Sequence, residues 1–221
     1  MLSVEQLTTL LANGTLETLW MTVLATLLAY VIGIPLGVCL YNTSSEGIWS
    51  NKPINLVLGV IVNVFRSIPF LILLVAILPF TKLIVGTTIG TAATVVPLVV
   101  AAAPYVARMV ESSLKEVDPG VVEAARAMGT SGIQMVTKVF LPEAKPSLLV
   151  GAAISLATIL GYSAMAGFVG GGGLGAIAIN YGYYRYQGDV MLITVVLLVI
   201  IVQIFQEGGL VLARKLDKRL K

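Results

Sequence analysis

The stretch EAARAMGTSGIQMVTKVFLP, residues 123–142, differs from the sequence on both sides of it. Polar and apolar residues are mixed within it, and a glycine and a proline interrupt it, whereas most of the chain is continuously apolar. To predict the fold, we ask what kind of structure the apolar sequence on both sides of this amphipathic stretch forms.

The composition is that of a membrane protein. Of the 221 residues, 57% are hydrophobic and only 11% are charged, which lies outside the range of soluble globular domains. We expect a single membrane domain over residues 1–221. The chain has no histidine and no Cys/His cluster, so the sequence indicates neither a metal site nor an integral membrane enzyme. It also lacks a phosphate-binding loop, and its scattered lysines and arginines form no basic face for nucleic acid.

Five apolar runs are long enough to cross a membrane, which takes about 20 residues in a helix. The predicted spans are residues 15–41, 54–80, 90–112, 146–168 and 189–212. These runs lack the alternating pattern of barrel strands, so helices are favoured. The sequence predicts an all-α polytopic membrane protein with five transmembrane helices. Residues 118–142 form a loop between the third and fourth of them.

Five spans place the two termini on opposite sides of the membrane, and the positive charges distinguish the sides. One side carries Lys82 and Arg185, and Arg66 and Arg108 are assigned to spans. The other ten of the fourteen lysines and arginines fall on the second side: Lys52, Lys115, Arg126, Lys138, Lys145, Arg214, Lys215, Lys218, Arg219 and Lys221. By the positive-inside rule the second side is cytoplasmic. The loop 118–142 and the C-terminus are thus predicted to be cytoplasmic, and the N-terminus external.

The loop itself is predicted to form two short helices that meet at a turn. Asp118 is a candidate N-cap, followed by a proline at the first helical position, and Gly129 ends the first helix. Thr130 or Ser131 caps the second helix, which the leucine and proline at 141–142 stop. Two interpretations remain open. The pair lies on the lipid headgroups, or it is a docking element for a soluble partner.

The spacing within the loop resembles a known pattern. The residues that carry the resemblance are Glu123, Ala124, Ala125, Gly129, Val139, Leu141 and Pro142. The pattern is similar to the "EAA" loop of the permease subunits of ABC importers, with valine at 139 where that family usually has isoleucine. The resemblance implies that the loop is a coupling helix seated in a cleft of a separate ATP-hydrolysing subunit.

Further segments resemble the methionine-uptake permeases of type I importers: NGTLETLWMT, FRSIPFLILL, VPLVVAAAPYVARMVE, GYSAMAG and GGGGLG. The resemblance implies a homodimer in a bacterial inner membrane, two ATPase subunits that bind ATP and Mg, and an external substrate-binding protein. No cofactor is expected in this chain. Permeases for polar amino acids share the Phe-Arg-x-x-Pro string, so another amino acid or small solute is an alternative. A self-sufficient channel or secondary transporter is a second alternative, although inverted repeats or intramembrane acidic sites would then be expected.

Five residues are candidates for the translocation path or its gate. Arg66, followed by Ser67, lies within a predicted span, where a cation costs about 2.5–3.5 kcal/mol on insertion scales. We expect it to face protein or water, either on the path or dimer interface or in a structural pairing. Tyr162, Ser163 and Met165 precede the glycine-rich segment, where a flexible thioether beside small residues suits a surface that opens and reseals. Ordinary helix packing is the alternative for these three.

Other features near the span ends have local interpretations. Glycines at 167 and 170–173 are expected to end the fourth span in an external loop. Arg108 and Glu111 are three residues apart and are interpreted as a helix-surface pair of small energetic value. Prolines within or near the spans can kink helices, as hinges or merely through packing: Pro35, Pro69, Pro79, Pro97 and Pro104.

Overall fold

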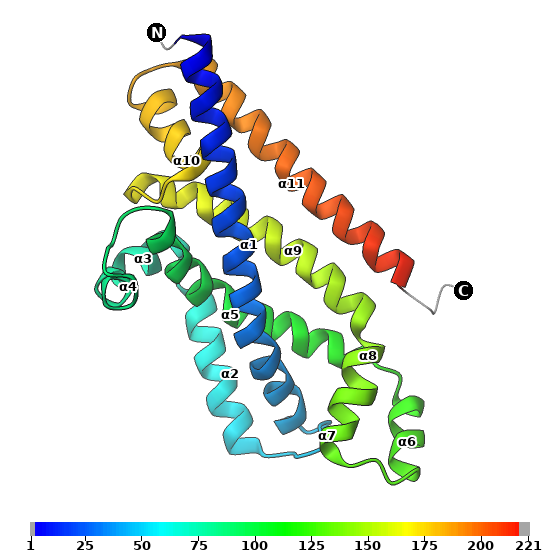
Figure 1. Ribbon diagram of the computed structural model, residues 1–221. Helices are drawn as coiled ribbons and strands as arrows, with labels where there is room; N and C mark the ends of the chain where they lie inside the picture. The colour runs from blue at the N-terminus through cyan, green and yellow to red at the C-terminus, as the bar shows by residue number, and fades with distance from the viewer. Residues whose placement is uncertain (1–2, 217–221) are drawn as a thin grey trace.

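The computed structural model describes residues 3–216. This part of the chain contains four long apolar helices (Figure 1). They are α1 (Val4–Thr43), α5 (Thr91–Lys115), α9 (Lys145–Ala166) and α11 (Gly188–Leu216). A fifth candidate span is the bent pair α2 (Lys52–Ser67) and α3 (Phe70–Ala76). The shorter elements are α4 (Leu78–Val85), α6 (Pro119–Ala127), α7 (Gly132–Gln134), η1 (Met135–Phe140), α8 (Leu141–Glu143), η2 (Gly167–Val169), α10 (Gly173–Ile177) and η3 (Ala178–Tyr183).

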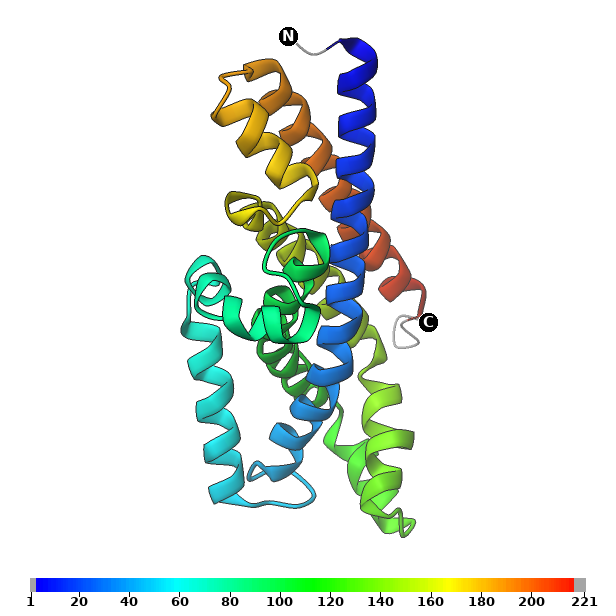
Figure 2. The same cartoon turned by 60° about the vertical axis from the view of Figure 1, so that its left-hand side comes forward.

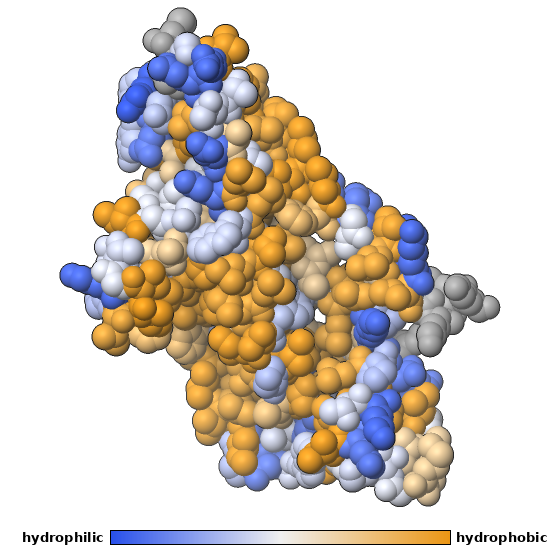
Figure 3. All heavy atoms as spheres, viewed as in Figure 1, coloured by the Kyte–Doolittle hydropathy of each residue, from blue (hydrophilic) through white to orange (hydrophobic). Residues whose placement is uncertain are grey.

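The all-α prediction is confirmed, and the described residues contain no β-strand. Three charges used in the sidedness argument lie outside the described residues: Lys218, Arg219 and Lys221. Figure 3 shows hydrophobic residues over the middle of the visible face and hydrophilic residues gathered toward its two ends. This distribution suits a protein whose middle is surrounded by lipid.

The most extensive helix packing joins α1 to α5. The stripe of α1 that is buried includes Ala25, Ala29, Gly33 and Gly37, each four residues after the last. A β-carbon on Gly33 would lie 2.6 Å from a methyl of Val106, and one on Gly37 would lie 2.5 Å from the carbonyl oxygen of residue 107. Only glycine permits this approach. Small residues at such spacing are typical of helix contacts in membranes. Lipid is as apolar as the side chains, so helices associate there through close packing rather than through the hydrophobic effect.

The second predicted span, 54–80, is not one helix. The chain bends by 100° between α2 and α3. Ile68 is extended, with φ −79° and ψ 123°, as a residue before proline prefers, and Pro69 has no N–H to continue the α2 ladder. The chain therefore changes direction within the predicted span 54–80, at one of the prolines expected to kink a helix.

The fourth span ends at Ala166 in the glycine-rich region, as predicted, but the following segment is also helical. α10 continues directly into the π-helical η3, and the sequence analysis did not predict either element. The cap of α10 comes from α1: Leu174 N–H donates to Thr18 Oγ1 at 2.8 Å, and Gly173 N–H donates to Glu17 Oε2 at 2.7 Å. These bonds satisfy amides that a helix N-terminus leaves without partners.

The two ends of the molecule differ in content (Figures 1 and 2). At one end, α6, α7, η1 and α8 gather beside the start of α2 and the end of α1, and we call this the coupling-loop end. The start of α1 and α10 lie at the opposite end. Because α1 has 40 residues, one helix reaches both.

We predict that Thr18→Val destabilises the protein more than Thr15→Val. Both hydroxyls donate to the carbonyl four residues back, at 2.8 Å, but only the buried Thr18 also accepts the Leu174 N–H. Leaving that amide without a partner should cost about 1–3 kcal/mol. Denaturation of the full chain in detergent measures the difference, and equal stability of the two variants would contradict the capping role.

Candidate functional site

The loop between α5 and α9 begins as the sequence predicts. The Asp118 side chain caps α6 by accepting the Gly120 N–H at 2.7 Å. Gly129 follows α6 with φ +78°, a left-handed conformation that favours glycine. Of the two candidate caps for the second helix, Ser131 is the N-cap, and it forms a reciprocal capping box with Gln134. The conformation of the turn between the two helices is thus determined by residues within the turn, namely Gly129 and Ser131.

The end of the loop differs from the prediction. The helix does not stop at residues 141–142, because the π-helical η1 leads into α8 and then, after Ala144, into α9. Pro142 occupies the first turn of α8, where its missing N–H costs little. Leu141 is half-buried and Pro142 is exposed. The loop is therefore connected to the fourth span by a nearly continuous helical path.

The coupling loop has an inner and an outer face. Ala125 and Phe140 are buried, and the Phe140 ring meets the ring of Tyr41, at the end of α1, edge to face at 5.0 Å. Glu123 and Ala124 are exposed on the outer face. Exposed apolar side chains accompany them: Val121, Met128 at 79% and Ile133 at 72% exposure. Apolar groups exposed beside charged ones are typical of an interaction surface.

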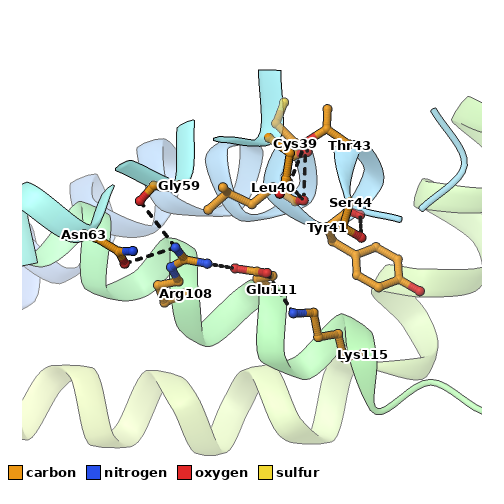
Figure 4. A network of polar contacts seen from close by, with 11 residues as sticks. Cys39, Leu40, Tyr41, Thr43, Ser44, Gly59, Asn63, Arg108, Glu111 and Lys115 are labelled. Carbon is orange, nitrogen blue, oxygen red and sulfur yellow. Dashed lines mark hydrogen bonds and ion pairs between the residues drawn. The ribbon is translucent and has the colours of Figure 1, made fainter. Parts of the chain in front are cut away.

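An ionic network centred on the buried Glu111 lies where α5 approaches this loop (Figure 4). Glu111 is 6% exposed and pairs with Arg108 at 2.6 Å and with Lys115 at 2.9 Å. Arg108 also donates to Asn63 Oδ1 on α2 at 3.0 Å and to the Gly59 carbonyl at 3.4 Å. The predicted pairing of Arg108 with Glu111 is confirmed, but Glu111 is buried rather than on the helix surface. The network fastens α2 to the last turns of α5, directly before the coupling loop.

The candidate path residues are partly brought together. Arg66 and Ser67 are exposed in the last turn of α2, immediately before the break, rather than in the middle of a span. Beyond the break, the Phe70 ring stacks on Tyr162 of α9, with centroids 4.6 Å apart and planes 6° apart. The break and the end of α9 thus lie side by side. This contact follows from the bend at Pro69, and the sequence analysis did not predict it.

Ser163 and Met165 lie in different environments. The Ser163 hydroxyl is buried and donates to the Leu160 carbonyl of its own helix at 2.7 Å. Met165 is 45% exposed. Ser163 therefore lines no open surface in this structure, and the expected set of three neighbouring path residues is divided.

The fold and the amphipathic loop define a class, a polytopic membrane protein with an exposed helical loop at one end. Residues 29–221 match the family described as binding-protein-dependent transport system inner membrane component, and the chain belongs to this family.

Relatives and a solved structure match most of the chain. The probable D-methionine transport system permease protein MetI of Vibrio cholerae is 52% identical over 210 residues, or 95% of this chain and 93% of the relative. The D-methionine transport system permease protein MetI of Escherichia coli K12 is 52% identical over 163 residues, or 74% of this chain and 75% of that protein. A structure of the inward-facing MetNI methionine ABC transporter contains a chain with a TM-score of 0.96 and 49% identity, covering 98% of this chain and 100% of that one.

We predict that Glu111→Ala lowers the stability of the detergent-solubilised protein by on the order of 2 kcal/mol. The substitution leaves Arg108 and Lys115 without their shared anion, although partial exposure of both cations moderates the loss. Glu116→Ala is the control, because Glu116 is exposed at the end of the same helix. Denaturation curves compare the two, and a Glu111→Ala protein as stable as the control would contradict the structural importance of the network.

Proposed function

We propose that this chain is the permease subunit of an ATP-driven importer for methionine in a bacterial inner membrane. The observation that carries the proposal is the near full-length match to the permease chain of the MetNI methionine ABC transporter. The relatives named for D-methionine transport support the same substrate class. The chain transports and is not an enzyme, so hydrolysis of ATP belongs to a partner subunit.

The proposed assembly contains a second copy of this chain, two ATPase subunits that bind ATP and Mg, and an external substrate-binding protein. The description of the family as binding-protein-dependent supports the last of these. It also disfavours a self-sufficient channel or secondary transporter. A permease for another amino acid or small solute stays an alternative, and an uptake assay with competing solutes distinguishes it.

The coupling-loop end is proposed to be cytoplasmic and the opposite end external. The distribution of cations supports this orientation. Among the described residues, the helical segments that meet at the coupling-loop end carry Lys52, Lys115, Arg126, Lys138 and Lys145. Positive charge of this kind is typical of cytoplasmic loops.

The division of the coupling loop into two faces suggests how it works. Glu123 and Ala124 on the outer face would contact the ATPase subunit, while Ala125 and Phe140 hold the inner face to the bundle. ATP binding would draw the two coupling loops of the dimer together and open the path outward, and hydrolysis would reverse the change. Gly129 would preserve the turn between the two short helices.

The helix break is proposed to form part of the translocation path or its gate. Arg66 and Ser67 stand at the end of α2, and Tyr162 and Met165 stand at the end of α9 beside α3. A discontinuous helix that lines a cavity is a common way to build such a site in a membrane. We leave Ser163 out of this set because its hydroxyl is buried against its own helix.

The coupling role is tested with Gly129→Val and Glu123→Lys. Valine is strained at φ +78°, and lysine reverses a charge that the partner would contact. We expect both proteins to insert as dimers but to bind the ATPase subunit more weakly or to hydrolyse ATP without uptake, with a cost of about 2 kcal/mol or more for a desolvated charge reversal. The assay compares ATPase binding, hydrolysis and methionine uptake in proteoliposomes.

Glu5→Lys is the matched control for the charge reversal, because Glu5 is exposed in the first turn of α1 at the opposite end. Uptake as in the unmodified complex for both Gly129→Val and Glu123→Lys would identify the loop as a passive interfacial helix pair.

Orientation is tested with reporters fused to the two ends. A fusion after Lys221 should be active in the cytoplasm, and one ahead of Met1 should be external, because an odd number of spans separates them. Both reporters on the same side would rule out five spans.

A further inference from the structure

We propose that Trp49 is a positioning residue that sets the start of the second coupling helix, α7, an inference that rests on the proposed coupling function. Trp49 lies in the turn between α1 and α2, residues 44–51, which approaches α7 at the coupling-loop end (Figure 1). A β-carbon on Gly132 would lie 2.3 Å from Cζ2 and 2.8 Å from Cε2 of the Trp49 indole. The ring therefore rests directly against the α-carbon of Gly132.

Glycine at position 132 is required for space rather than for backbone conformation. Gly132 is the first residue of α7 and does not have a positive φ, unlike Gly129 at +78°. Inside a helix, glycine is less favourable than alanine by up to about 1 kcal/mol. At Gly129, in contrast, a β-carbon would meet no heavy atom of the described residues within 4 Å. Gly129 and Gly132 thus serve different purposes, and substitutions can separate them.

The turn that carries Trp49 is fixed to both flanking helices. The backbone N–H of Trp49 donates to the Asn42 carbonyl at 3.0 Å, and the backbone N–H of Asn51 donates to the Thr43 carbonyl at 2.9 Å. The Asn55 side chain of α2 donates to Thr43 Oγ1 at 3.1 Å. These bonds anchor the backbone that carries the ring, so the ring contacts Gly132 from a turn that is tied to the end of α1.

Burial alone does not account for the tryptophan. Trp49 is 51% exposed, so half of this large side chain contributes nothing to packing within the chain. What it does is hold the N-terminal end of the α7–η1 segment. The other end is held by Phe140 against Tyr41. Ile133, the residue that follows Gly132, is among the exposed apolar residues of the outer face. A shift of the ring would therefore shift the proposed ATPase contact.

The experiment uses the complete complex in proteoliposomes and measures methionine uptake per ATP hydrolysed, on equal amounts of assembled complex. The variants are Gly132→Ala, Trp49→Ala and the double variant. The added methyl of Gly132→Ala collides with the indole and forces α7 or the ring to move, so we expect the ratio to fall by about fivefold. Trp49→Ala removes the contact without a collision and should lower the ratio less than Gly132→Ala does. Removing the ring also makes room for the methyl, so the double variant should recover from the Gly132→Ala level to that of Trp49→Ala.

Gly129→Ala is the matched control. Its defect arises from the left-handed φ, so Trp49→Ala should not rescue it. A merely structural loss of stability would lower the amount of complex and leave the uptake-to-hydrolysis ratio of the assembled fraction unchanged.

The outcomes separate the inference from the proposed function. Suppose that the unmodified complex takes up methionine. If Gly132→Ala then leaves the ratio unchanged, or if the double variant is as defective as Gly132→Ala, the positioning role is overturned and the proposed function is not. If the unmodified chain neither binds an ATPase subunit nor supports ATP-driven uptake, the proposed function is overturned and the inference with it. If Trp49→Ala rescues Gly132→Ala but not Gly129→Ala, the result supports both the positioning role of Trp49 and the proposed function.

Discussion

The close approach of α1 and α5 is the constraint on which the rest of the structure depends. Gly33 and Gly37 leave no room for a β-carbon between the two helices. In lipid, such packing supplies much of the free energy of association, because burying apolar surface against another helix gains little over burying it in hydrocarbon. Since α1 has 40 residues, about twice what a membrane requires, fixing it on α5 also fixes what its two ends contact.

Those contacts lie at opposite ends of the molecule. Near its start, α1 caps α10 through Thr18. At its other end, Tyr41 meets Phe140 of the coupling loop. The buried network at Glu111 adds α2 to the same unit through Arg108. We infer that a force on the coupling loop acts on α1, α2 and α5 together. At the α2–α3 break the chain leaves this unit, and α3 has a different orientation from α2.

Features that depend on a few neighbouring residues could be predicted from the sequence. The cap at Asp118 and the turn at Gly129 are of this kind, as is the existence of the apolar spans. The break at Pro69 was not predictable, because proline alone does not determine the outcome. α1 continues past Pro35, and α5 continues past its own two prolines. In a membrane helix, neighbouring groups can satisfy the carbonyl that a proline frees, and the local sequence does not show where they lie.

The contacts that build the site join segments far apart in the sequence. The cap of α10 spans 156 residues, and neither half contains a signal for the other. Helix orientation is a further obstacle. A soluble helix reveals its buried face through its polar residues, but a spanning helix is apolar on the faces toward lipid and toward protein alike. Hence Ser163 and Met165, two residues apart on α9, read as one cluster, although packing buries the first and exposes the second. The side chains that line a membrane path are therefore assigned by packing between helices, which the composition of each helix does not encode.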